Sequence, residues 1–262
     1  MTLLDHDRYC DEIIAQTEQL IVTIADADLS VTVPTCPDWT LAELLRHLGR
    51  AHRYAETVVR TRATAPIPFD QVPDAAGPDE DDPAALGTWL AAGAARLVDV
   101  LREAGPDTKV WTWCSRQDTA FWARRQAHET VVHRADAALA AGREFTVDPA
   151  IAADTVDEFL ELLSSPPVAT RLPALAELRG PYRSIHLHAT DTAEELGAEW
   201  LIELGEDGFT WRRSHAKATV AVRGPMADVL QVLYRRLPAN SERVEVLGDA
   251  KLLDFWLERA KM

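Results

Sequence analysis

The chain has 262 residues, 47% of them hydrophobic, so it is long enough to bury the core of one large domain or of two small ones. Its formal net charge is −15 and it carries no basic stripe, which argues against a nucleic-acid partner. No run approaches the roughly 18 uncharged apolar residues of a membrane span, and the three scattered cysteines are typical of reduced thiols, so we expect a cytoplasmic protein with no membrane partner.

The first half of the sequence predicts helices. An amphipathic helix is expected from Asp5 to about residue 27, followed by a rigid, extended segment at 34–39. Thr40 and Glu43 then form a Thr-x-x-Glu capping box, which starts a second helix that runs to about residue 62. Residues 64–82 are rich in Ala, Pro and Asp and predict a long loop, which we interpret as a candidate lid.

Three further helices follow. Asp82 and Pro83 provide an N-cap with proline at the first helical position, and this helix is expected to reach about residue 104. The next helix spans about 118–141, before Gly142. A shorter fifth helix begins near residue 149 and ends near 164. Four long helices with a trailing fifth suggest a bundle with an interior site.

The hydrophobic period changes in the last third of the chain. Beyond residue 181, apolar and polar residues alternate, which predicts strands, a hairpin at 205–208 and two more helices. We therefore expect a mainly α protein with three parts: a four-helix bundle at 1–164, a linker at 165–181, and a small α+β domain at 182–262. We interpret His186 and His188, which alternate on a strand, as one face of the sheet and not as a ligand pair, and His215 gives no signal.

The fourth helix carries a polar stripe. Arg125, Glu129, His133 and Asp136 are spaced four, four and three, so they fall on one helix face. A carboxylate and an imidazole one turn apart can bind one divalent metal ion, although the same spacing also occurs in solvated ion-pair faces. A metal site needs a further ligand from elsewhere in the chain.

The second helix offers two histidines as that further ligand. His47 and His52 are five residues apart, about 140° around the helix axis, so only one of them should face the site. The helical wheel does not settle which one it is, because His52 lies nearer the middle of the apolar stripe and His47 lies on its shoulder.

Two motifs resemble a known family. Residues 34–40 followed by 44–49, together with the run from Phe121 to Asp136, are similar to the mycothiol-dependent maleylpyruvate isomerase family, a group of DinB-like metal-binding four-helix bundles with a small α/β domain after the bundle. The resemblance implies that His47, Glu129 and His133 are the metal ligands, that the ion is most often zinc, and that one coordination position is open. It also implies mycothiol as the thiol cofactor.

The resemblance implies an enzyme, with two outcomes that the motifs do not separate. A thiol bound to zinc loses its proton below its free pKa of about 8.5. It can add to an activated double bond and leave again, which isomerises a maleylpyruvate-like compound from cis to trans. It can also stay on an electrophile, which makes the protein an S-transferase. The alternatives are a non-catalytic metal-binding or ligand-sensing bundle, and a metal-hydroxide hydrolase. The partners would be a small-molecule thiol and an electrophilic substrate.

Three other residues are weaker candidates, and no catalytic residue is expected beyond the metal site. Asp136 either orients a ligand from behind or is a surface acid. Arg125 either binds a substrate carboxylate or forms a salt bridge with Glu129 or Asp136. Trp122, with Trp111 and Trp113, either lines an apolar pocket or belongs to the core.

Overall fold

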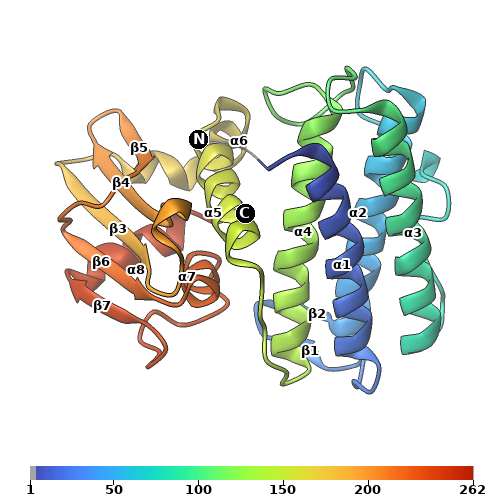
Figure 1. Cartoon of the computed structure of the whole chain (residues 1–262), viewed down its shortest axis with the longest axis horizontal. Coiled ribbons are helices and arrows are strands. Elements are labelled where there is room, and N and C mark those ends of the chain that lie inside the picture. The colour runs from blue at the N-terminus through green and yellow to red at the C-terminus, as the bar shows by residue number, and fades with distance from the viewer. Residues whose placement is uncertain (1–3, 262) are drawn as a thin grey trace. The chain divides into compact units, whose positions relative to one another are not determined.

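The structure, a computed structural model, describes residues 4–261 (Figure 1). It comprises two compact units, one that ends at Phe145 and one that begins at Thr146. The first is helical and the second combines a mixed sheet with helices. The predicted fold class, a mainly α protein with a helical bundle followed by a small α+β domain, is therefore confirmed.

The first unit is a bundle of four long helices that lie side by side in Figure 1. α1 and α2 each pack against both α3 and α4. The α2–α4 interface therefore brings the two histidine-bearing segments of the sequence together. The helices span α1 His6–Ile24, α2 Leu41–Thr61, α3 Pro83–Ala104 and α4 Thr119–Ala140.

Side-chain caps fix where these helices begin. Thr40 and Glu43 form the predicted capping box at the start of α2, and the Asp82 side chain accepts a hydrogen bond from the backbone N–H of Ala85 at the start of α3. α2 and α3 approach closely at Gly49, where an added Cβ would overlap the ring of Trp89. Glycine at that position therefore sets the spacing between the two helices.

The segment before α2 differs from the prediction of a single extended stretch. Thr32–Val33 (β1) and Cys36–Thr40 (β2) pair antiparallel as a small two-stranded sheet. β1 packs against α2 and α4, and β2 packs against α2. Since backbone hydrogen bonds rather than proline stiffness hold this segment, Thr35 at its turn has a defined position beside α4.

The loop at 64–82, predicted as a candidate lid, is tied to the bundle. Its one short helix, η1, spans Phe69–Gln71. The Asp74 carboxylate accepts hydrogen bonds from Arg53 Nε at 2.9 Å and from Trp89 Nε1 at 3.1 Å, and Arg46 Nη2 donates to the Pro78 carbonyl at 2.9 Å. These contacts anchor the loop at two points, which a freely closing lid would lack.

One helix, α3, is long and apolar enough to cross a membrane by length and composition alone. Half of that apolar window is buried inside the structure, where Leu90, Leu97 and Leu101 have no exposed surface. Its apolar character is that of a core helix in a bundle.

The second unit is built on a five-stranded mixed sheet in the order β5-β4-β3-β6-β7. β3 and β6 are parallel, and the other neighbours are antiparallel. The hairpin between β4 and β5 lies where it was predicted. The strands span β3 Arg183–Ala189, β4 Glu199–Gly205, β5 Gly208–Arg213, β6 Val220–Gly224 and β7 Glu245–Gly248; the helical segments span α5 Pro149–Leu163, α6 Pro166–Arg171, η2 Pro173–Leu178, η3 Glu194–Leu196, α7 Met226–Leu233 and α8 Ala250–Arg259.

The division between the units precedes α5, whereas the predicted boundary at residue 164 placed this helix with the bundle. α5 packs against α7 and α6. Its buried Asp157 accepts a hydrogen bond from Trp200 Nε1 of β4 at 2.7 Å and pairs with Arg213 Nη2 of β5 at 2.6 Å. The predicted linker also differs, since most of it forms α6 and η2. Pro166 stands at the start of α6, where proline is compatible with a helix.

Candidate metal centre in the helical bundle

His47, Glu129 and His133 converge between α2 and α4. The Oε1 atom of Glu129 lies 3.5 Å from His47 Nε2 and 3.2 Å from His133 Nε2. The two imidazole rings are 5.0 Å apart and nearly perpendicular. One ligand atom from each of the three side chains lies within 4.8 Å of the others. Two imidazoles and one carboxylate at this spacing can surround a single divalent ion.

His133 is oriented from behind by a short chain of hydrogen bonds. Its Nδ1 lies 3.0 Å from Asp136 Oδ2, and Asp136 also accepts a hydrogen bond from the hydroxyl of Thr35. Asp136 is fully buried. A carboxylate on Nδ1 holds a proton there, so Nε2, which faces Glu129, is the ring nitrogen that can bind an ion once it has lost its own proton.

Charge is concentrated in this group. Burial alone would raise the pKa of the Glu129 carboxyl, but contacts with His133 and His47 and the charge of Arg125 hold it well below 4.5. Burial would likewise lower the pKa of His133, but Asp136 and Glu129 raise it to about 9. His133 is therefore an imidazolium held between two carboxylates. A divalent cation can replace the proton on its Nε2.

Arg125 lies one turn before Glu129 on α4, with only 6% of its side chain exposed. Its Nη2 is 3.1 Å from Glu129 Oε2, the carboxylate oxygen that does not face the histidines. Of the two interpretations of Arg125, the structure shows the salt bridge to Glu129. The arginine can thereby orient this carboxylate.

His52 does not join the group. Its ring is fully buried, and its Nε2 lies 2.9 Å from the hydroxyl of Thr130 on α4. Burial, with a smaller effect from Arg53, lowers its pKa to about 3, so the ring is neutral. The structure thus places His47 rather than His52 beside Glu129, and His52 packs in the α2–α4 interface.

Trp122 belongs to an aromatic cluster of the bundle. It is 3% exposed, its Nε1 donates a hydrogen bond to the Trp111 carbonyl at 2.9 Å, and its ring lies about 6 Å from those of Tyr54 and Trp111. This burial supports the core interpretation for Trp122 itself. Trp111 and Tyr54 remain partly exposed.

Sequence reasoning missed two residues at this site. Trp39, near the end of β2, packs against the His47 ring, with centroids 4.7 Å apart and the ring planes tilted by 41°. Thr35, in the turn between β1 and β2, reaches Asp136 across 101 residues of sequence. Both lie in the Pro-Thr-Cys-Pro-Asp-Trp motif, but the motif alone did not show that it folds back onto α4.

Two family models cover most of the chain. Residues 10–138 match the model described as "Mycothiol maleylpyruvate isomerase N-terminal domain", and residues 150–255 match the "MDMPI C-terminal domain". The gap between the two matches contains the division between the structural units. No curated protein matches the sequence.

Two solved structures resemble this one. A crystal structure of the mycothiol-dependent maleylpyruvate isomerase is 15% identical, with a TM-score of 0.56, and the match covers 94% of this chain and 95% of that chain. A histidine-to-alanine mutant of the mycothiol-dependent maleylpyruvate isomerase is 14% identical, with a TM-score of 0.57 over the same shares. At this level of identity the likeness shows a common fold.

Proposed function

We propose a metal-assisted, mycothiol-dependent reaction for this chain, on the premise that it belongs to the mycothiol maleylpyruvate isomerase family. The observation that carries the proposal is the convergence of His47, Glu129 and His133 within 4.8 Å of one another. The proposed activity is either cis–trans isomerisation of a maleylpyruvate-like compound or transfer of the thiol to an electrophile. Metal and thiol would be shared by both reactions.

The donor set fits a divalent ion with borderline-soft ligand preferences, of which zinc is the most common. His47, Glu129 and His133 would hold it, with Asp136 fixing the His133 tautomer and Arg125 holding the second oxygen of Glu129. Such an ion, when bound, lowers the pKa of a thiol beside it, so that a thiolate is available at neutral pH. Three protein ligands leave a position for that thiol.

We place the organic part of the substrates along the same α2–α4 face. Tyr54 is seven residues after His47, and Trp122 is seven before Glu129, so each lies two turns from the metal ligand on its own helix, on the same helix face. The exposed Phe69 extends this wall, with its ring 5.1 Å from that of Tyr54. In this proposal Tyr54 and Phe69 contact the substrate, and the buried Trp122 supports them.

We also propose that the protein acts in the cytoplasm. Cys10, Cys36 and Cys114 form no disulfide within the described residues, as expected for thiols in a reducing compartment. The net charge of −15 does not favour a nucleic-acid partner, and we propose the small thiol and its electrophile as the partners.

The test is a metal-dependent response to mycothiol. Untagged protein is purified without added metal, analysed for bound elements, stripped with chelator, and melted with and without Zn²⁺ and mycothiol. Saturating mycothiol, at about 100 times its Kd, should stabilise the zinc form by about 2.7 kcal/mol, which is roughly 5–10 °C in Tm for a protein of this size. The metal-free form should not respond.

Two variants make this test specific. Glu129→Gln should abolish the mycothiol response, while Glu18→Gln, which removes an exposed carboxylate from α1, should retain it. A response of equal size without metal, or in Glu129→Gln, would contradict the proposal.

The two reactions are separated by the fate of the thiol. With maleylpyruvate as the probe, isomerisation leaves mycothiol chemically unchanged and catalytic in amount. With an α-haloketone as the probe, S-transfer consumes one mycothiol per substrate and forms a thioether. Mass spectrometry of the thiol pool after many turnovers distinguishes these outcomes. Full turnover of either probe without any thiol would favour a metal-hydroxide hydrolase instead.

A further inference from the structure

The second unit contains a separate group of potential metal ligands. Its three histidines, His186, His188 and His215, all gather around Glu199. One ligand atom from each of the four side chains lies within 4.8 Å of the others. This is more donors than the bundle site brings together, and none of them belongs to that site.

The sheet explains why these four side chains meet. His186 and His188 alternate with Ile185 and Leu187 on β3, so the histidines share one face while the buried aliphatic residues face the core. Glu199 on β4 is the direct cross-strand partner of His188. His215 follows β5, next to Ser214, whose backbone N–H donates to the Glu199 carbonyl at 3.0 Å.

The histidines surround a single carboxylate oxygen. Glu199 Oε2 lies 2.9 Å from His186 Nε2, 3.2 Å from His188 Nδ1 and 2.6 Å from His215 Nδ1. The three rings are 5.5–5.8 Å apart and edge-on to one another. Three imidazole nitrogens thus point at one centre from different directions, as they do around an ion.

One of these nitrogens is not satisfied by the protein. His186 is 5% exposed, and its buried Nε2 has no hydrogen-bond partner among the described residues, because its close approach to Glu199 lacks hydrogen-bond geometry. A buried polar atom without a partner costs free energy. A cation at the centre of the group would satisfy it.

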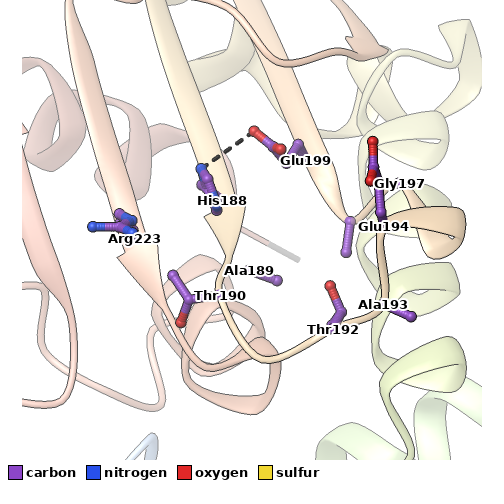
Figure 2. Close-up of a pocket in the computed structure, with 10 residues that line it drawn as sticks. His188, Ala189, Thr190, Thr192, Ala193, Glu194, Gly197, Glu199 and Arg223 are labelled. Carbon is purple, nitrogen blue, oxygen red and sulfur yellow. Dashed lines mark ion pairs between the residues drawn. The ribbon is translucent and has the colours of Figure 1, made fainter.

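Two hollows flank the group and give access to it. Figure 2 shows the smaller, of about 230 Å³, with His188 and Glu199 facing each other and Arg223 on the neighbouring strand. The larger, of about 460 Å³, is lined by His186, His188 and His215. An ion could therefore reach the histidines from solvent without opening the sheet.

We propose that His186, His188, His215 and Glu199 form a second divalent metal site, selective for a late first-row transition ion such as Zn²⁺. Three imidazoles and one carboxylate favour such ions over Mg²⁺ or Ca²⁺, which prefer oxygen ligands. Four protein ligands form a closed set, which is typical of a structural ion. This ion cross-links β3, β4 and the segment after β5.

Only small side-chain movements are required. Ligand atoms around a tetrahedral zinc with bonds of about 2.0–2.1 Å are roughly 3.3 Å apart, compared with a maximum of 4.8 Å in this group. The side chain of His215 is 75% exposed, so the protein leaves room for it to rotate. Glu199, which now pairs with the histidines, would turn so that it shares an ion with them.

The test counts ions in the untagged, full-length protein. After chelation, the protein is equilibrated with Zn²⁺, freed of excess metal and analysed for zinc per chain. Wild type should hold two ions, His188→Ala/His215→Ala one, His47→Ala one, and the triple variant none. His188 and His215 are 25% and 75% exposed, so the variant should fold; circular dichroism verifies this.

A matched pair of variants checks the carboxylate. Glu199→Gln should weaken zinc binding at the second site by at least about 10–100-fold, which is what loss of an outer-sphere partner costs. Glu203→Gln, on the same strand and paired with Tyr182 and Arg212, should leave zinc binding unchanged. Zinc content that is the same in wild type and His188→Ala/His215→Ala would overturn the second site. Failure of the bundle site alone would appear as zinc content that His47→Ala does not change.

Discussion

The bundle site and the histidine cluster combine the same residue types, histidine and glutamate, but lie on different secondary structures. The bundle site stands on two packed helices, and Asp136 holds His133 from behind. In the cluster, Glu199 is the only carboxylate that pairs with the three histidines within residues 4–261, and it sits at their centre. The first arrangement fixes the orientation of one ligand, and its three ligands would leave a coordination position open. The second offers more ligands with less support.

The charge of the histidines differs in the same way. The pKa of His133 rises to about 9 despite its burial, because two carboxylates contact its ring. The pKa of His186 falls, since burial outweighs its single carboxylate neighbour. In these two rings the balance between burial and the neighbouring carboxylates sets the direction of the pKa shift, and the carboxylate behind His133 also selects the nitrogen that faces forward.

The largest expected effect comes from removing the central carboxylate of the bundle site. Glu129→Gln should lower zinc affinity there by more than about 100-fold, because an anionic ligand is lost where an outer-sphere partner alone is worth about 10–100-fold. Turnover should disappear with the ion. Zinc titration followed by an activity assay measures both.

The same variant tests whether the two sites are independent. Zinc binding at the histidine cluster should be unchanged in Glu129→Gln. A simultaneous loss of both ions in a correctly folded variant would contradict the separation of the sites.

Asp136→Asn should have the next largest effect. The amide can no longer enforce a proton on His133 Nδ1, so zinc affinity in the bundle should fall by about 10–100-fold while the ligands remain. Thr35→Val, which removes the hydrogen bond to the other oxygen of Asp136, should cost less. Competition with a fluorescent chelator gives the affinities. If Thr35→Val were the more damaging change, Asp136 would not act through His133.

Much of the bundle could be predicted because its signals are local. The N-caps at Asp82 and Thr40 and the spacing of Glu129 and His133 each lie within a turn or two of helix. The choice of His47 over His52 could not be made from the helical wheel, which puts His52 nearer the middle of the apolar stripe and His47 on its shoulder. It was decided by which α4 residue each ring meets, Glu129 or Thr130.

What the sequence did not reveal depends on contacts between distant segments. The side-chain hydrogen bond that ties α5 to the sheet joins Asp157 and Trp200, which are 43 residues apart. The histidine cluster likewise needs the register of β3 against β4 and the position of the segment after β5. His215 carries no local pattern that would link it to His186.

A smaller effect is expected from pH, through the buried His52. Its pKa is lowered from 6.5 to about 3, so the unfolded chain takes up a proton that the fold excludes. This group therefore contributes stability above pH 6.5 that is lost as the pH falls toward 3, with a slope of up to about 1.4 kcal/mol per pH unit. The pKa of His133 is raised from 6.5 to about 9. The stability that this group contributes is therefore full below pH 6.5 and is lost as the pH rises from 6.5 to 9, outside the window in which His52 contributes.

Chemical denaturation of metal-free protein between pH 4 and 8 measures this slope. His52→Gln should reduce the slope below pH 6.5. Equal slopes in wild type and His52→Gln would mean that the buried ring is protonated without unfolding.

Arg125→Lys should have the smallest effect, and it sharpens the distinction between a ligand and its support. Lysine keeps the positive charge beside Glu129 but loses the planar guanidinium that holds Oε2 at 3.1 Å. Because the three ligands remain, zinc affinity should change by no more than about tenfold, the lower end of what a supporting partner contributes. Arg125 is almost fully buried against Glu129, so kcat should fall with zinc occupancy and KM for a carboxylate substrate should stay the same. Steady-state kinetics at a fixed, limiting zinc concentration separates the two parameters. A rise in KM with kcat unchanged would show instead that the guanidinium binds the substrate's carboxylate, the interpretation that its place on the polar stripe first suggested.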